Sequence, residues 1–150
     1  MNYYLIKTNS ANPDFHVLIN QLDAHFSVLN GDKDAFYSQY NHVDVIKHVV
    51  LAYQNGKPIG CGAIKEFSEN IMEIKRMFVL PELRGQGIAS SILRNLENWA
   101  RQLGCAETVL ETLKTEEKVV AMYAKNGYQM IPNYGQYVGV ESSVCMNKKL

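Results

Sequence analysis

Thiols are scarce in this chain, and the three that exist stand apart from one another. Cys61, Cys105 and Cys145 form no Cys-x-x-Cys pair, and an odd number of cysteines does not suit a disulfide framework. Because the three cysteines are far apart in the sequence, they do not form the clustered ligand set of a zinc finger. Nothing in their spacing indicates a catalytic cysteine. We therefore expect reduced thiols, a cytoplasmic protein and no metal site.

Charge of one sign and long apolar runs are lacking as well. Fifteen basic residues balance fifteen acidic ones, so no overall field attracts nucleic acid or an anionic membrane surface. No segment approaches the roughly 18 apolar residues of a membrane span, and the first residues, MNYYLIKTNS, do not open like an export signal. These absences predict a soluble, unexported protein that binds neither nucleic acid nor membranes.

Repeats, linkers and low-complexity segments are also absent from the sequence. The 150 residues, of which 47% are hydrophobic, suffice for one compact domain with its own core. We expect residues 1–150 to form this single domain.

Local signals in the N-terminal part of the chain predict a strand and a helix. Residues 3–7 have the composition of a short strand. Residues 12–14, Asn-Pro-Asp, supply a cap, a first-turn proline and a first-turn acid, and the helix that follows ends at Asn30-Gly31. Residues 32–47 fit a second short helix followed by a loop, and periodicity does not decide whether their cluster of Phe36, Tyr37, Tyr40 and His42 belongs to the edge of the core or to the wall of a pocket.

A meander of three strands is predicted next. Residues 48–54 and 57–67 are two β-rich runs around Asn55-Gly56, the favoured hairpin turn. A third strand runs from residue 71 to residue 80 and is stopped by Pro81.

Helix and strand signals alternate in the rest of the chain. A helical stripe runs from Ile88 to Leu103, and Gly104 stands where a left-handed cap is expected. The remaining predicted elements are a strand at 108–110, a helix capped by Thr115 and closed by residues 125–127, and strands at 128–131 and 143–148.

The junction between the third strand and the helical stripe is rich in glycine. In residues 84–89, RGQGIA, Gly85 and Gly87 let the main chain approach a ligand closely. The opening turn of the helix adds unpaired N–H groups and the positive end of its dipole, so a pyrophosphate suits this turn. The alternative is that the two glycines merely permit a tight connection from strand to helix.

These features together resemble the GNAT superfamily of acyl-CoA-dependent N-acetyltransferases. Its core signature is Arg or Gln, two free positions, Gly, one free position, and Gly or Ala, which Arg84, Gly87 and Ala89 satisfy. The strand before this signature, the helix after it and the segment AMYAKNGY at 121–128 also stand where the family has them. The resemblance covers roughly residues 48–149.

The resemblance implies a mixed α/β fold of the GNAT type, in which a mostly antiparallel N-terminal meander is followed by a V-shaped splay between two central strands, with helices on both faces. It implies that acetyl-CoA binds in the splay as a cosubstrate, and that backbone groups of Met77, Phe78 and Val79 pair with its pantetheine arm. The pyrophosphate is then held by the backbone N–H groups of the glycine turn, which belong to Arg84, Gly85, Gln86, Gly87, Ile88, Ala89 and Ser90.

The implied reaction is direct attack of a primary amine on the thioester, with the thiolate of CoA leaving. Tyr123 falls on the tyrosine position of the family and is the predicted general acid, although it also suits the buried stripe of its helix. Glu73 is the predicted base and acts through water; the alternative is an ion pair with Lys75. Glu111 and His42 are weaker candidates, because capping or surface solvation explains each of them.

Two other functions fit parts of the sequence. In a dinucleotide-binding protein, Gly85, Gly87 and Ser90 would form the glycine motif. Such a fold places its glycine turn directly after the first strand, whereas in this chain a meander of three strands precedes the turn. A non-catalytic sensor would bind acyl-CoA in the same splay without transferring the acyl group. The presence of Tyr123, the predicted general acid, favours an enzyme over such a sensor. Glu116 stands where many relatives carry Asn or Gln, which weakens one implied contact to the cofactor.

The acceptor pocket is expected between residues 30–42 and residues 132–142. Both segments are aromatic, with Phe36, Tyr37, Tyr40, Tyr134 and Tyr137 as its candidate walls. No acidic stripe suited to polyamines or basic tails is evident, so we expect a small metabolite amine or an amino acid as acceptor. The alternative is an N-acetyltransferase that acts on proteins or peptides. The sequence is also compatible with a homodimer.

Overall fold

A computed structural model describes residues 2–31, 36 and 45–150 of the chain. Its sheet has seven strands in the order β1-β2-β3-β4-β5-β7-β6, and every neighbouring pair is antiparallel except β4 and β5. The strands are β1 (Tyr4–Thr8), β2 (His48–Gln54), β3 (Lys57–Ser68), β4 (Ile71–Val79), β5 (Glu107–Leu113), β6 (Gln129–Ile131) and β7 (Ser143–Lys149). The helices are α1 (Pro13–Asn30), α3 (Ile88–Gln102) and α4 (Glu117–Lys125), with short 3₁₀ turns at η2 (Pro81–Leu83) and η3 (Gly135–Tyr137).

The predicted meander is confirmed, and its hairpin turn has the expected geometry. Asn55 and Gly56 have φ angles of 53° and 74°, which are the two left-handed positions that a tight hairpin between β2 and β3 requires. The N-terminal cap of α1 is confirmed as well, because the Asn12 side chain accepts a hydrogen bond of 2.9 Å from the backbone N–H of Asp14.

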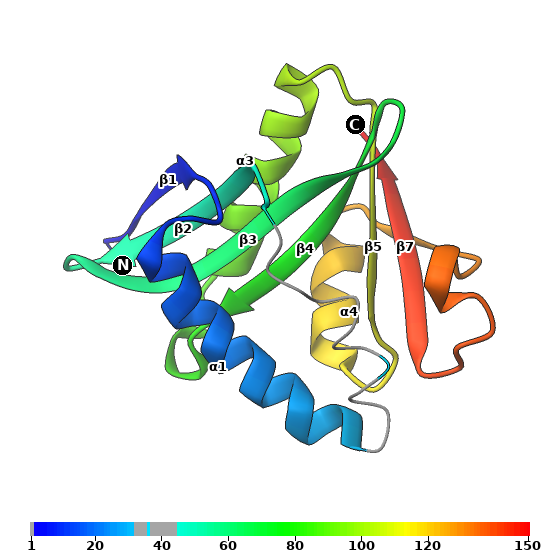
Figure 1. The fold of residues 1–150 in the computed structure, drawn as a ribbon, viewed down its shortest axis with the longest axis horizontal. Coiled ribbons are helices and arrows are strands. Elements are labelled where there is room, and N and C mark those ends of the chain that lie inside the picture. The colour runs from blue at the N-terminus through cyan, green and yellow to red at the C-terminus, as the bar shows by residue number, and fades with distance from the viewer. Residues whose placement is uncertain (1, 32–35, 37–44) are drawn as a thin grey trace.

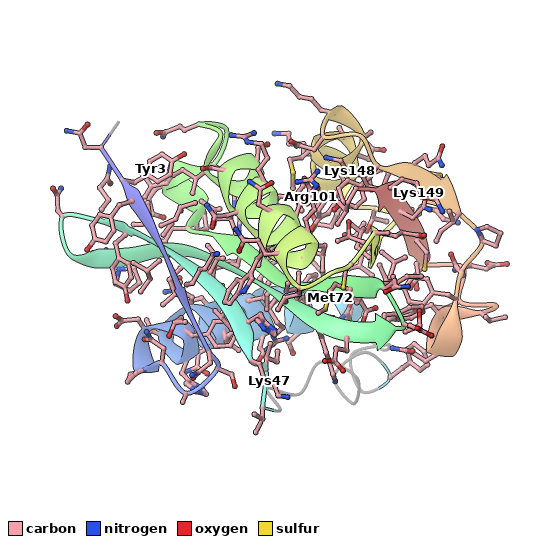
Figure 2. The ribbon with its side chains drawn as sticks, turned by 90° about the horizontal axis from the view of Figure 1, so that it is seen from above. Tyr3, Lys47, Met72, Arg101, Lys148 and Lys149 are labelled. Atoms are coloured by element: carbon pink, nitrogen blue, oxygen red, sulfur yellow. The ribbon has the colours of Figure 1, made fainter. Side chains whose placement is uncertain are left out.

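Helices cover both faces of the sheet, as the fold class predicted. Figures 1 and 2 show α1 on one face and α3 on the other. A Cβ atom at Gly62 of β3 would lie 2.9 Å from side-chain carbons of both Ile92 and Leu96, so this glycine lets α3 sit directly on the sheet. On the opposite face, the guanidinium of Arg76 in β4 reaches Asp23 of α1 at 3.0 Å.

A buried polar network holds α3 against the C-terminal half of the sheet. Glu97 of α3 is 2% exposed, and it accepts hydrogen bonds from Lys148, labelled in Figure 2, and from the hydroxyl of Tyr128, both at 2.9 Å. Tyr128 also shares a 2.7 Å hydrogen bond with Thr108. Because the buried carboxylate is fully paired, α3 has a fixed position relative to β5 and β7.

The two central strands part partway along their length. β4 and β5 pair through only three positions, the last of which joins Glu73 to Val109. β5 instead pairs along its whole length with β7. Beyond Glu73, β4 carries an extra residue relative to β3, and Arg76 at this bulge has a φ of 59°. The splay that the resemblance implied is therefore present, and the space between the strands widens toward the end of β4.

Two local predictions needed correction. Thr115 does not cap a helix; Glu116 occupies the N-cap of α4 without a side-chain cap bond, because the preceding strand β5 runs on to Leu113. That strand was predicted only at 108–110, and its pairing with β7 extends it.

Cys61, Cys105 and Cys145 take part in no disulfide within the residues that the structure describes. Three candidates from the sequence, Tyr37, Tyr40 and His42, lie outside the described residues. None of the helices in the described ranges is both long enough and apolar enough to cross a membrane.

Candidate active site

The glycine turn between β4 and α3 is an open array of backbone N–H groups. Gly85 and Gly87 have φ angles of 79° and 85°, a conformation that glycine adopts without strain. The amide of Ser91 is the first in α3 to reach a backbone carbonyl, that of Gly87, at 3.0 Å. Within the described part of the chain, the N–H groups from Gly85 to Ser90 have no hydrogen-bond acceptor, and they surround the positive end of a 15-residue helix.

Side chains on either side of the turn fix its position. Arg84 folds back along β4, where its Nε donates to the Val79 carbonyl at 2.9 Å and its guanidinium lies 5.5 Å from the centre of the Phe78 ring. Asn126 donates to the Ser90 hydroxyl at 2.9 Å and thereby ties the end of α4 to the first turn of α3. Asn126 was not predicted from the sequence, because nothing local to it indicates a contact 36 residues away.

A cavity of about 550 Å³ lies between the splayed ends of β4 and β5. It runs from the glycine turn, past the outer half of β4, to a group of buried polar side chains near the point where the strands part. The cavity brings together eleven of the twelve site residues predicted from the sequence, all but Gln86: Glu73, Met77, Phe78, Val79, Arg84, Gly85, Gly87, Ile88, Ala89, Ser90 and Tyr123.

Tyr123 reaches the cavity from α4 and is almost completely buried, with 4% of its surface exposed. Its ring packs edge-on against Tyr128, with the ring centres 5.6 Å apart. Burial raises the pKa of its phenol above the ordinary value of 10, and the nearby carboxyl of Glu111 raises it further. The hydroxyl therefore keeps its proton throughout the physiological range, as a proton donor must.

Glu73 lies at the inner end of the cavity, where the strands part. The hydroxyl of Tyr134 donates to its Oε2 at 2.6 Å, and the ammonium of Lys75 lies 3.8 Å from its Oε1. The sequence analysis placed Tyr134 in the wall of the acceptor pocket, and the structure adds that this tyrosine orients a carboxylate. The ion pair with Lys75 that was weighed against a catalytic role for Glu73 is present, at a distance that permits no direct hydrogen bond.

Glu111 shares this cavity and faces it from β5. Because Glu73 pairs with Val109, the alternation of side chains along β5 puts Glu111 on the same face as Glu73. Burial raises the pKa of Glu111 from its ordinary 4.5 to about 7; a 2.7 Å hydrogen bond from Ser143 and the charge of Lys75 oppose the rise, and the charge of Glu73 adds to it. Its sequence neighbours did not reveal this environment, because the burial comes from distant segments.

The aromatic wall predicted at 132–142 is present beside these carboxylates. Tyr137 lines the cavity and is 2% exposed, and its ring centre lies 5.9 Å from that of Tyr134. On the opposite side of the opening, Nε2 of His25 in α1 lies 3.1 Å from Oε1 of Glu116 at the start of α4. This contact occupies the Glu116 carboxylate, the residue at which the chain departs from the pattern of the family.

No group of three or more His, Cys, Asp and Glu side chains within residues 2–31, 36 and 45–150 is arranged to hold a metal ion. At its inner end the cavity offers the phenol of Tyr123, the carboxyl groups of Glu73 and Glu111 and the ammonium of Lys75, and the backbone N–H groups of the glycine turn lie at its other end.

Comparison with known proteins identifies the family of the chain. Residues 15–128 match the acetyltransferase (GNAT) family. The IAA acetyltransferase of Azospirillum brasilense is 30% identical over 141 residues, which cover 89% of this chain and 88% of that protein. The crystal structure of an acyl-CoA N-acyltransferase from Klebsiella pneumoniae superposes with a TM-score of 0.82 at 30% identity, covering 99% of this chain and 97% of that chain.

A further structure shares the fold at lower identity. The PaiA N-acetyltransferase of Thermoplasma acidophilum, solved in complex with coenzyme A, has a TM-score of 0.73 at 20% identity and covers 100% of both chains. The mixed sheet and its helices thus have the fold of the acyl-CoA N-acyltransferases. The chain belongs to the acetyltransferase (GNAT) family, and it is an acyl-CoA-dependent N-acetyltransferase.

Proposed function

We propose that residues 1–150 act as a single catalytic domain that moves the acetyl group of acetyl-CoA to the primary amine of a small metabolite or amino acid. The observation that carries the proposal is the continuity of one cavity, which joins the N–H groups of the glycine turn to a phenol and two carboxyl groups. One cavity of about 550 Å³ can thereby hold an anionic cofactor at one end and support proton transfer at the other.

The cofactor is held, in this proposal, by main-chain groups. The N–H groups from Gly85 to Ser90 receive the pyrophosphate, because they lack other acceptors and lie at the positive end of α3. The pantetheine arm lies along residues 77–79, on the side of β4 that has no strand partner beyond Glu73. The orientation of Arg84 along β4 supports this arrangement, because its side chain braces the turn and leaves the amides open.

The reaction is direct transfer through a tetrahedral intermediate. The amine nitrogen forms a bond to the thioester carbon, the carbon–sulfur bond breaks, the sulfur leaves with its electron pair and takes a proton, and the amine loses one. Holding the two reactants together supplies roughly 7 to 11 kcal/mol of the barrier reduction. The remaining task of the protein is to move protons.

Removing the amine proton is the larger of the two proton costs. A lysine-like amine with a pKa of about 10.4 loses its proton at a cost of roughly 4 to 5 kcal/mol at neutral pH, whereas a thiol with a pKa near 8.5 costs only about 2 kcal/mol. We propose that the carboxylate pair of Glu73 and Glu111 accepts this proton. The predicted base, Glu73, shares the task with Glu111, whose pKa of about 7 suits proton exchange at neutral pH.

Tyr123 is the proposed acid that protonates the departing sulfur. Its burial against Tyr128 fixes the ring, and its raised pKa keeps the proton available. A tyrosine is well matched to this role, because the thiolate needs only modest help to leave.

The test is a turnover screen that follows free thiol from acetyl-CoA with a panel of amines, amino acids and peptides. We expect thiol release with small amines or amino acids and formation of the N-acetyl product in equal amount. Turnover of peptides alone favours the protein N-acetyltransferase. Binding of acetyl-CoA, seen as a thermal shift, without acetyl transfer to any acceptor would favour the acyl-CoA sensor and overturn the proposal.

A further inference from the structure

Lys75 is an ammonium group without a hydrogen bond in the described part of the chain. Its side chain is 13% exposed and lines the cavity, and its one ion-pair contact is to Glu73 at 3.8 Å. An ammonium carries three donors, and leaving them unpaired in a partly buried site is costly. The position therefore suits a group that acquires its acceptor from a ligand.

Three other charged groups near Lys75 already have partners. Arg76, the next residue of β4, holds Asp23 at 3.0 Å. Oε2 of Glu73 accepts from Tyr134 at 2.6 Å, and Glu111 accepts from Ser143 at 2.7 Å. Among the described residues, Nε of Arg76 is buried without a partner, but the guanidinium is held by Asp23 through Nη2, whereas the ammonium of Lys75 has no hydrogen bond. Of these two adjacent cations, Lys75 is the less constrained to meet a ligand anion.

Lys75 also faces the proposed proton-transfer pair. Glu73 and Val109 are register partners, so Lys75 and Glu111 are the next residues on the same face of their strands, on opposite sides of the widening gap. A ligand between them meets a cation from β4 and a carboxyl from β5. An amine with a carboxylate on the same molecule matches both groups.

We propose that Lys75 binds the anionic group of the acceptor and that the acceptor is an amine bearing a carboxylate, with an amino acid as the simplest case. The inference rests on the proposed function, since it assigns the acceptor half of the same cavity. In this arrangement the carboxylate takes the open donors of Lys75, and the amine turns toward Glu111 and the thioester. The site selects for a charge that a simple alkylamine or a peptide-linked lysine side chain lacks.

The first test compares each amino acid with its carboxamide. The wild-type protein is expected to prefer the acid, measured as the ratio of kcat/KM for the acid to that for the amide. Lys75→Met is expected to lower this ratio about 10- to 100-fold, the loss of one charge-assisted hydrogen bond. Comparing the variant with the wild type cancels the difference in amine pKa between acid and amide.

Two further variants control for charge and folding. Lys57→Met removes the same charge at the exposed start of β3, and it is expected to leave the ratio unchanged. Lys75→Arg keeps the charge and is expected to retain most of the preference. An equal ratio in the wild type and Lys75→Met, or equal loss for acid and amide, would overturn the inference while leaving N-acetyl transfer intact.

A binding measurement separates this inference from the proposed function. Calorimetry with CoA-saturated protein compares an N-acetyl amino acid with its N-acetyl carboxamide, so it needs no turnover. Preference for the acid that Lys75→Met abolishes supports the anion site even in a protein that fails to acetylate any amine. Equal binding of acid and amide by the wild type refutes it, and this result is available even when Lys75→Met does not fold.

Discussion

Glu111→Gln is expected to stabilise the protein at pH 8 and to slow its reaction. The pKa of Glu111 rises on folding from 4.5 to about 7, so between these values the folded protein binds more protons than the unfolded chain, and stability falls as the pH rises. A shift of this size corresponds to about 3 kcal/mol at a pH above 7. Glutamine removes the charge and can still accept from Ser143.

The pKa shift already includes the attraction of Lys75, so we expect a gain of up to about 3 kcal/mol at pH 8, or up to about 10 °C in Tm. The difference from the wild type should vanish below about pH 4, where Glu111 is protonated in both the folded protein and the unfolded chain. Melting curves from about pH 3.5 to 8.5 measure it. Glu107→Gln on the same strand is the matched control and should have the opposite sign, because hydrogen bonding to Asn147 holds the pKa of Glu107 below its ordinary value.

The same substitution tests the proton-transfer role. In the wild type, kcat/KM should rise with pH through about 7, as Glu111 loses its proton, and Glu111→Gln should lower kcat/KM about 100-fold and remove this rise. A variant that is more stable at pH 8 but fully active, with an unchanged pH profile, would refute the assignment of Glu111 to the base. A variant without the pH-dependent gain in stability would refute the burial argument itself.

Three other substitutions, together with one control, test the remaining parts of the site. Tyr123→Phe should lower kcat about 100-fold and leave acetyl-CoA affinity within about 2-fold, as followed by steady-state kinetics and calorimetry; full turnover would exclude the acid role. Gly87 and Gly104 have φ angles of 85° and 88°, and a Cβ added at either would meet no atom within 4 Å. Gly87→Ala and its control Gly104→Ala should therefore each lower the free energy of unfolding in denaturant by about 1 kcal/mol. Only Gly87→Ala should weaken CoA binding, and equal CoA affinities of the two variants would argue against the turn as the pyrophosphate site. Asn126→Ala should weaken CoA binding a few-fold by releasing Ser90, and an unchanged dissociation constant would count against that support.

Local signals predicted those parts of the fold that local chemistry determines. The turn at Asn55-Gly56, the cap at Asn12 and the glycine turn at 85–87 each depend on the backbone preferences of a few adjacent residues, and all three formed as expected. Thr115 was misassigned as a cap for the complementary reason: pairing with β7 carried β5 to Leu113, and long-range pairing overrode a local preference.

The candidate site was predictable only in part. The positions that we propose to bind the cofactor lie close together in the chain, so a short motif is enough to predict them. The acceptor half depends on residues brought together by the sheet register, such as Glu73 with Tyr134, 61 residues away, and Glu111 with Ser143, 32 residues away. Neither contact, nor the pKa of about 7 that burial imposes on Glu111, leaves a trace in the adjacent sequence.

The central claim is that this cavity acetylates the amine of a small molecule. The most direct measurement is the initial rate of thiol release from acetyl-CoA with an amino acid acceptor, with the product identified by mass spectrometry and with Tyr123→Phe in parallel. The account predicts one N-acetylated product per thiol released and a rate about 100-fold lower for the variant. Tight acetyl-CoA binding with no acetylated product from any small amine or amino acid would contradict it.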